Sequence, residues 1–191
     1  GEDPYYSVET VETAWHAIRV WVAQRMLGHA FAHPADVHDV LARNFRGHNM
    51  AKAAVEMGCW GLRAVLDDVP LAKLIGGTRE RLVTGISIGI QSSPEALVER
   101  ARAAVASGYR KVKLKIQPGA DVEFVRAVRT AVGPDISLMV DANSAYTLAD
   151  APLLEQLDEF RLIMIEQPLA HDDLVRHADL QRRLSTPIRL D

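Results

Sequence analysis

Hydrophobic residues follow two different periods along the chain, and the change between them falls near residue 80. Before that point, apolar residues recur every three or four positions, which is typical of amphipathic helices. After it, short apolar runs alternate with longer amphipathic stretches, which is typical of strand–helix repeats in a parallel sheet. The sequence therefore predicts an α-helical part over residues 1–80 and an α/β part over residues 81–191.

Three helices are predicted in the first part. The first spans residues 8–27, and Gly28 is placed to end it. The second is shorter and follows Pro34, a residue suited to the first turn of a helix. The third begins at the cap residue Asn49 and runs to about Asp68. Its apolar stripe is rich in small residues, which indicates a close approach to a neighbouring helix.

Five strands and four intervening helices are predicted in the second part. The strands are short, mostly apolar runs bounded by turn residues, and they cover residues 82–90, 111–116, 136–140, 162–165 and 188–190. The helices between them cover residues 94–107, 121–132, 147–160 and 172–184.

An open five-stranded sheet and a partial barrel both fit this alternation. The open sheet usually reverses its strand order and often has a glycine-rich phosphate loop after the first strand. Here the polar segment Gln91-Ser92-Ser93-Pro94 follows the first run instead. A complete eight-stranded barrel needs ~250 residues. The expected fold is therefore α/β, a partial TIM-type (β/α) barrel of about five strands with an α-helical part in front of it.

Four charged residues stand at the downstream ends of consecutive apolar runs: Lys115, Asp141, Glu166 and Asp191. They are 26, 25 and 25 residues apart, about the length of a strand, a crossover helix and the next parallel strand. This period places all four side chains at one edge of a parallel sheet. Carboxylates suit Mg²⁺ or Mn²⁺, whereas zinc favours nitrogen and sulfur. Since like charges held together are unstable without a cation, the pattern predicts a divalent metal site beside a lysine. Taken singly, each acid could instead cap a helix or form a salt bridge at the rim.

Lysines alternate with apolar residues along the run 111–116. Lys111, Lys113 and Lys115 therefore share one face of the predicted strand. Inside a barrel, burial and mutual repulsion would lower the pKa of these lysines from about 10.4 towards a value that suits a base. The alternative is an exposed edge strand that lysines protect from pairing. Lys111, nearest the strand start, is the most suited to a structural role.

Composition and charge exclude several kinds of binding partner and leave the predicted fold and metal site unchanged. A net charge of −3 provides no electrostatic basis for binding nucleic acid or an acidic membrane. No apolar run approaches the ~20 residues that cross a bilayer. The single cysteine, Cys59, cannot form an internal disulfide and weakly favours a reducing compartment. The seven histidines lack metal-binding pair spacing, and most are expected to be solvated. We expect a soluble, cytoplasmic protein without nucleic-acid or membrane partners.

The strand ends carry motifs that resemble the enolase superfamily and fit its muconate-lactonizing subgroup. The motifs are Lys113-Leu114-Lys115, Asp141-Ala142-Asn143, Ile165-Glu166-Gln167-Pro168 and Leu190-Asp191. Within that subgroup, residues 109–116 and 141–148 resemble most the o-succinylbenzoate synthase and N-acylamino acid (N-succinylamino acid) racemase families. The resemblance spans essentially the whole chain, including Met50-Ala51-Lys52-Ala53 in the helical part.

The resemblance implies an enzyme that uses Mg²⁺, with Mn²⁺ as an alternative, to remove a proton α to the carboxylate of a small-molecule substrate. Asp141, Glu166 and Asp191 would hold the metal ion. Lys115 would remove the proton, and Lys113 would help to stabilise the enediolate that results. A Lys base beside Mg²⁺ is the general pattern of this superfamily.

Two further residues, Ser87 and Asn143, are implied as substrate contacts. The implied reaction is the dehydration that forms o-succinylbenzoate in menaquinone biosynthesis, with N-acylamino acid racemisation as a second activity. Alternatives are a dipeptide epimerase or a muconate cycloisomerase and, in another class, an inactive metal-binding barrel fragment.

The resemblance also implies the identity of the two parts. Residues 1–80 would be the helical part of a capping domain, incomplete at its N-terminus, and Pro4-Tyr5-Tyr6 would belong to a loop that closes over substrate. Residues 81–191 would be the first part of the barrel, incomplete at its C-terminus. A second acid/base lysine would lie beyond Asp191, so these residues alone are expected to have little or no activity.

Overall fold

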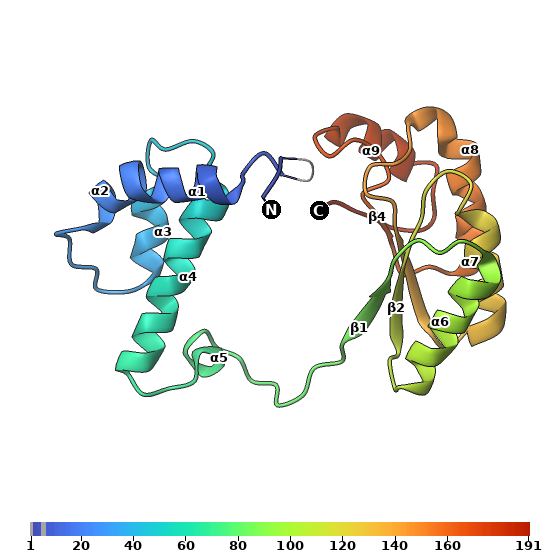
Figure 1. The fold of residues 1–191 in the computed structure, drawn as a ribbon, viewed down its shortest axis with the longest axis horizontal. Coiled ribbons are helices and arrows are strands. Elements are labelled where there is room, and N and C mark those ends of the chain that lie inside the picture. The colour runs from blue at the N-terminus through green and yellow to red at the C-terminus, as the bar shows by residue number, and fades with distance from the viewer. Residues whose placement is uncertain (1, 5–6) are drawn as a thin grey trace. The chain divides into compact units, whose positions relative to one another are not determined.

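The chain divides into two compact units, Gly1–Glu80 and Arg81–Asp191 (Figure 1). The structure is a computed structural model, and it describes residues 2–4 and 7–191. Tyr5 and Tyr6, which the resemblance assigns to a substrate-closing loop, lie outside the described residues. Within the described part of the chain, no helix combines the length and the apolar character needed to cross a membrane.

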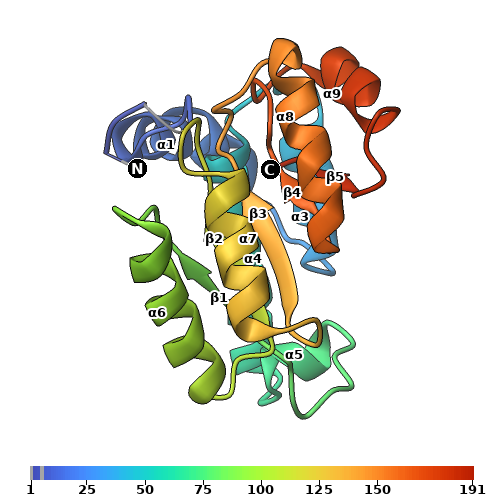
Figure 2. The ribbon, with the colours of Figure 1, turned by 90° about the vertical axis from the view of Figure 1, so that its right-hand side faces the viewer.

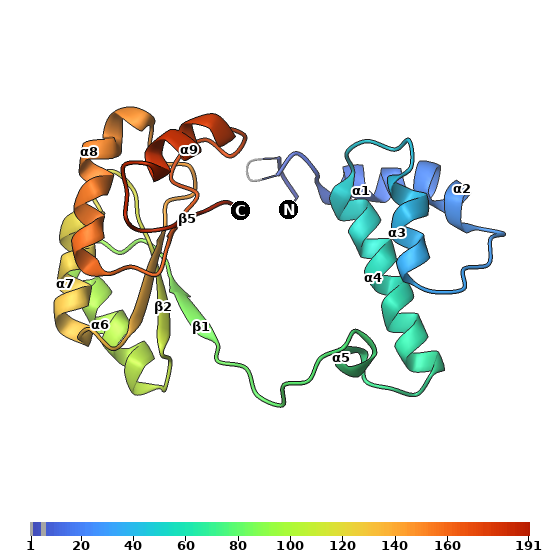
Figure 3. The same ribbon diagram turned by 180° about the vertical axis from the view of Figure 1, so that it is seen from behind.

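Helices form the regular structure of the first unit. They are α1 (Val11–Ala17), a π-helical turn (Ile18–Val22), α2 (Ala23–Met26), α3 (Ala35–Ala42), α4 (Asn49–Leu66) and α5 (Leu71–Leu74). The three predicted helices are confirmed, although the first widens into a π-helix in its middle and Asn49 is the first residue of α4, not its cap. Helices α3 and α4 lie side by side (Figure 3).

The first helix of this unit begins with reciprocal capping. The Thr10 hydroxyl accepts a hydrogen bond from the Thr13 N–H at 3.3 Å, and the Thr13 hydroxyl accepts one from the Thr10 N–H at 2.8 Å. Such a capping box satisfies N–H groups that have no partner inside the helix. The core of the unit is small: Val22, Val37 and Leu41 form its buried cluster.

The second unit is a parallel sheet in the order β1-β2-β3-β4-β5. Its strands are β1 (Gly85–Ile88), β2 (Lys111–Lys115), β3 (Ser137–Asp141), β4 (Ile165–Glu166) and β5 (Ile188–Arg189). The sequential order agrees with the predicted barrel topology and excludes the reversed order of a doubly wound sheet.

Helical segments connect the strands. They are α6 (Pro94–Ala106), α7 (Val122–Val132), a 3₁₀ turn (Leu148–Asp150), α8 (Ala151–Leu154), a second 3₁₀ segment (Glu155–Phe160) and α9 (Leu174–Gln181). Helices α6, α7 and α8 lie side by side over one face of the sheet (Figure 2). The predicted continuous helix over residues 147–160 is thus three short pieces.

The first and fourth strands are much shorter in the structure than the predicted runs of residues 82–90 and 162–165. Pairing with β2 is confined to Gly85–Ile88, and the apolar Leu82 and Val83 lie exposed before it. The fourth strand pairs only through Ile165 and Glu166. Apolar character therefore extends beyond the residues that find a strand partner.

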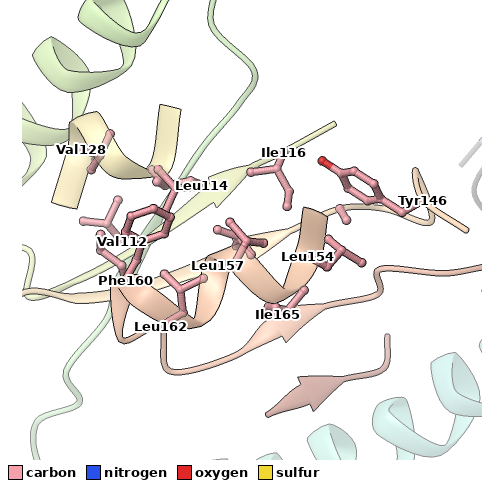
Figure 4. Packing of buried hydrophobic residues seen from close by; sticks show 14 of the residues in the cluster. Val112, Leu114, Ile116, Val128, Tyr146, Leu154, Leu157, Phe160, Leu162 and Ile165 are labelled. Carbon is pink, nitrogen blue, oxygen red and sulfur yellow. The ribbon is translucent and has the colours of Figure 1, made fainter. Parts of the chain in front are cut away.

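The alternation along β2 separates the core from the opposite face of the sheet. Val112, Leu114 and Ile116 are buried, while the lysines between them are partly exposed. The buried side chains pack with those of the α8 region, including Leu154 and Leu157 (Figure 4). The predicted alternation is confirmed, and it leaves the lysines on the face that the covering helices do not occupy.

Candidate active site

Three neighbouring strands bring the predicted reactive residues to one edge of the sheet. The parallel register places Lys115 beside Asp141, and Asp141 beside Glu166. In a parallel pair, residues in register point to the same face. The spacing of these residues in the sequence therefore becomes a row of adjacent side chains across β2, β3 and β4.

The row is joined by short charge-assisted hydrogen bonds. The Lys113 Nζ donates to Asp141 Oδ2 and to Glu166 Oε2, each at 2.8 Å. The Lys115 Nζ donates to the same Asp141 Oδ2 at 2.6 Å and to Asn143 Oδ1 at 2.5 Å. The carboxylates are nearly inaccessible, with side-chain exposures of 2 % for Asp141 and 5 % for Glu166. Buried acids of this kind need paired charges, and the two ammonium groups supply them.

The charges of this row shift its pKa values. Burial alone would raise the pKa of Asp141, but hydrogen bonds from Lys113, from Lys115 and from the Asn143 N–H lower it below its ordinary value. Burial alone would lower the pKa of Lys113, but Asp141 and Glu166 raise it. The predicted lowering of the lysine pKa is therefore wrong for Lys113. The two carboxylates within hydrogen-bond distance of the Lys113 ammonium group outweigh the effect of burial on its pKa.

Asp191 lies beyond the paired part of β5. The register partner of Glu166 on β5 is Arg189, so Asp191 follows two residues later. The Asp191 N–H donates to Gln167 Oε1 at 2.9 Å. Among the described residues, no group of three or more His, Cys, Asp or Glu side chains is arranged to hold a metal ion. The structure thus joins Asp141 and Glu166 through lysines and leaves Asp191 at the end of the adjacent strand.

The donor set fits a hard divalent cation. Asp141 and Glu166 offer only carboxylate oxygens, and Asn143 adds an amide oxygen beside Lys115. Mg²⁺ and Mn²⁺ prefer oxygen ligands of this type. Lys113 already balances the charge of both carboxylates, so the fit rests on the type of donor atom.

The predicted substrate contacts lie on the same face. Ser87 pairs in register with Lys113 across β1 and β2, and it is exposed there. Asn143 lies just after β3 in a left-handed conformation, with φ of 43°. Its N–H donates to Asp141 Oδ1 at 3.0 Å, which ties this turn to the carboxylate.

Three residues of the site were not identified from the sequence. Arg189 Nε lies 3.8 Å from Glu166 Oε1, and the alternation along β5 could have placed it on the same face as Asp191. Gln167 belongs to the Ile165-Glu166-Gln167-Pro168 motif, which by itself assigns it no task. His177, expected to be solvated with most histidines, is buried on α9 and contacts the turn after β4. No local pattern identifies His177, because its partners depend on how α9 packs.

Comparison with known proteins follows the division into two units. Residues 4–76 match the family profile described as "Mandelate racemase / muconate lactonizing enzyme, N-terminal domain". Residues 96–191 match the profile described as "Enolase C-terminal domain-like".

Individual relatives agree over nearly the whole chain. An o-succinylbenzoate synthase from Geobacillus kaustophilus is 50 % identical over 188 residues, covering 98 % of this chain and 50 % of the relative. An N-succinylamino acid racemase from Thermus thermophilus is 46 % identical over 188 residues, with the same coverage. A hydrophobic dipeptide epimerase from Enterococcus faecalis is more distant, at 32 % identity over 158 residues, 81 % of this chain and 44 % of that one.

A solved structure supports the fold. The enolase-superfamily member from Listeria innocua superimposes with a TM-score of 0.97 at 41 % identity, covering 100 % of this chain and 51 % of that one. The chain thus spans about half the length of the curated relatives and solved structures that it matches. With both family profiles matched in order and the strand-end residues in one row, the chain belongs to the enolase superfamily, in the mandelate racemase/muconate lactonizing enzyme group.

Proposed function

We propose that the whole protein is a Mg²⁺-dependent enzyme that removes a proton α to a substrate carboxylate. The observation that carries this proposal is the row of Lys113, Lys115, Asp141 and Glu166 at one edge of the sheet, joined at 2.6–2.8 Å. Asp141, Glu166 and Asp191 are the proposed metal ligands. Mn²⁺ is expected to replace Mg²⁺, because both accept oxygen ligands.

The residues have separate tasks in this proposal. An α-proton beside a carboxylate is weakly acidic, and its removal creates a second negative charge on the substrate. When bound, Mg²⁺ would supply positive charge for that carboxylate. Lys115, with a side-chain exposure of 29 %, is accessible enough to reach a substrate and accept the proton. Lys113 would add a fixed positive charge, and its contacts with both carboxylates favour the charged form.

We propose o-succinylbenzoate formation by dehydration as the reaction, with N-succinylamino acid racemisation as a second activity through the same proton removal. An o-succinylbenzoate synthase is 50 % identical to this chain, and an N-succinylamino acid racemase is 46 % identical. Dipeptide epimerisation is the second candidate, and the lower identity of the epimerase makes it less favoured. Ser87 and Asn143 are the proposed substrate contacts on the exposed face.

Each of the two units has its own place in the proposed enzyme. We propose that Gly1–Glu80 contributes helices to a capping domain and that Arg81–Asp191 contributes the first strands of a (β/α) barrel. A cytoplasmic location agrees with the single cysteine.

Isotope exchange tests the reaction and separates the substrates. The whole protein that carries these residues would be incubated in D₂O with Mg²⁺ and, in turn, the cyclohexadiene carboxylate precursor, N-succinylamino acids and dipeptides. Proton NMR would follow o-succinylbenzoate formation and loss of the α-proton signal. We expect product from the diene and exchange with N-succinylamino acids. Exchange with dipeptides alone would favour the epimerase.

A non-catalytic metal-binding role would give a different result. In that case no substrate would exchange, or Lys115→Ala would exchange as fast as the unmodified protein. Either result would contradict the proposed reaction, even if Mn²⁺ still bound.

A further inference from the structure

Gln167 is a buried glutamine that joins the ends of β4 and β5. It follows Glu166 directly and is 2 % exposed. Its main-chain N–H donates to the Arg189 carbonyl at 2.8 Å, and its side-chain Oε1 accepts the Asp191 N–H at 2.9 Å. One residue therefore holds the chain on both sides of Leu190, in the segment that leads to the third proposed metal ligand.

The orientation of the Gln167 amide is determined by its other partners. Its Nε2 donates to the Leu169 carbonyl at 3.1 Å and to the Ala170 carbonyl at 3.4 Å. Carbonyl oxygens only accept hydrogen bonds, so the amide nitrogen must face them and the amide oxygen must face Asp191. The turn after β4 thus presents a hydrogen-bond acceptor to the main chain just after β5.

His177 holds this turn from α9. It is 4 % exposed, its Nδ1 donates to the Asp173 carbonyl at 2.6 Å, and its Nε2 accepts the Leu169 N–H at 3.1 Å. A carbonyl on one side and an N–H on the other require the neutral ring with its hydrogen on Nδ1. The contacts run from α9 through Leu169 to the Gln167 amide and from there to Asp191.

We propose that Gln167 is a positioning residue that orients Asp191 for metal binding, and that His177 positions Gln167. This inference rests on the proposed function, because it takes Asp141, Glu166 and Asp191 as the ligands of a divalent cation. Lys113 contacts the side chains of Asp141 and Glu166, and Gln167 holds the main chain at Asp191. Groups that orient metal ligands typically change metal affinity 10–100-fold when removed.

A second glutamine provides a matched control at the other end of β5. Gln181 Nε2 donates to the Leu184 and Thr186 carbonyls at 3.3 and 3.2 Å, and its Oε1 accepts the Ile188 N–H at 2.6 Å. Like the Gln167 amide, it contacts two carbonyls and one main-chain N–H, but among the described residues it has no histidine partner. It holds the start of β5, however, and not the segment leading to Asp191.

The experiment compares Gln167→Leu with Gln181→Leu in the whole protein. Mn²⁺ would be titrated against each protein, with free Mn²⁺ measured by electron paramagnetic resonance, and thermal unfolding without metal would establish that each variant is folded. We expect Gln167→Leu to weaken Mn²⁺ binding about 10–100-fold and Gln181→Leu to leave it unchanged. Unchanged binding in Gln167→Leu, or equal weakening in both variants, would overturn the inference.

The test also separates this inference from the proposed function. Asp141→Asn should weaken Mn²⁺ binding at least as strongly as Gln167→Leu. If Asp141→Asn binds Mn²⁺ like the unmodified protein, the proposed metal site fails and the inference fails with it. If Asp141→Asn loses binding while Gln167→Leu retains it, only the inference fails.

Two variants of His177 test its part. His177→Gln places an amide oxygen near the position of Nε2 and can still accept the Leu169 N–H, whereas His177→Leu cannot. We expect His177→Gln to retain most of the Mn²⁺ affinity and His177→Leu to lose about 10-fold. Equal affinity in the two variants would show that His177 fills space without positioning Gln167.

Discussion

The two units are stabilised in different ways. The α/β unit has a continuous core that runs from Ile88 to Leu184, whereas the buried cluster of the helical unit consists of Val22, Val37 and Leu41. Helix α4 leaves large apolar side chains exposed, including Val65 at 76 % and Leu66 at 71 %. The α/β unit also contains all the charged residues proposed for catalysis.

This difference shows what a row of buried carboxylates and lysines requires. Buried carboxylates are costly unless their partners are held in place, and side chains on well-packed strands are held most firmly. The three strands that carry this row, β2, β3 and β4, each bury their opposite face in the large core. The amphipathic helices share only a small core, so they do not hold side chains as firmly. Their hydrophobic pattern in the sequence is nevertheless equally clear.

The largest expected effect contrasts the two ends of one strand. Lys115→Met should lower the rate of α-proton exchange in the whole protein by about 10²–10⁴-fold, the usual contribution of a general base. Lys111→Met removes the same charge from the same face of β2, but at its start, and should leave the rate nearly unchanged. Exchange measured in D₂O by proton NMR compares them. Equal losses would mean that the charge of the strand matters and the position of Lys115 does not.

The next effect compares the two cores. Leu157→Ala and Leu41→Ala each truncate a leucine that is no more than 1 % exposed. Such truncations cost about 2–5 kcal/mol, and the cost is larger where the surroundings cannot relax. We therefore expect a loss near the upper end of that range for Leu157 and near the lower end for Leu41.

Separate measurements report the two units. Trp15, Trp21 and Trp60 all lie in the helical unit, so urea unfolding followed by fluorescence measures the effect of Leu41→Ala. Hydrogen exchange of the β2 and β3 amides measures the effect of Leu157→Ala. A loss for Leu41 as large as that for Leu157 would contradict the difference between the cores.

A smaller effect concerns Asp158, which connects the α8 region to the approach to β5. Its carboxylate accepts the N–H groups of Ser185 and Thr186, both at 2.8 Å. Burial alone would raise the pKa of Asp158, but these hydrogen bonds lower it below its ordinary value. The Asp158 carboxylate therefore stabilises the fold fully above about pH 4, the ordinary pKa of an aspartate. This stabilisation is lost as the pH falls through the lowered pKa of Asp158.

Asp158→Asn tests this contribution. Near pH 7 the variant should lose about 1–3 kcal/mol, because the amide is a weaker acceptor and one of its two positions becomes a donor. The difference from the unmodified protein should shrink as the pH falls below 4. Urea unfolding followed by far-ultraviolet circular dichroism at several pH values would measure it. A difference that is constant with pH would exclude the carboxylate as its cause.

The smallest expected effects are local and should be similar in both units. Ser93 caps α6 by accepting the Ala96 N–H at 3.2 Å, and Thr10 caps α1. Ser93→Ala and Thr10→Ala should each cost about 1 kcal/mol, measured by urea unfolding. A much larger cost in one unit would mean that its cap also stabilises the packing around it.

Most of the fold could be predicted from the sequence, because its signals are local. The change of period near residue 80 and the alternation along β2 depend only on neighbouring residues. The regular spacing from Lys115 to Glu166 also predicted that charges on three strands would meet. The exact strand lengths were not predictable, since an apolar run such as residues 82–90 becomes a strand only where another strand pairs with it.

The composition of the site was only partly contained in the sequence. Lys115, Asp141 and Glu166 were identified by their position at strand ends, which a repeating strand–helix unit brings together whatever the details of packing. The hydrogen-bond partners of Gln167 and His177 were decided by the tertiary structure. So was the raised pKa of Lys113, because it depends on which oxygen lies 2.8 Å from its ammonium group. Periodicity specifies which edge of the sheet a side chain reaches, whereas hydrogen-bond partners depend on register and helix packing between segments far apart in the chain.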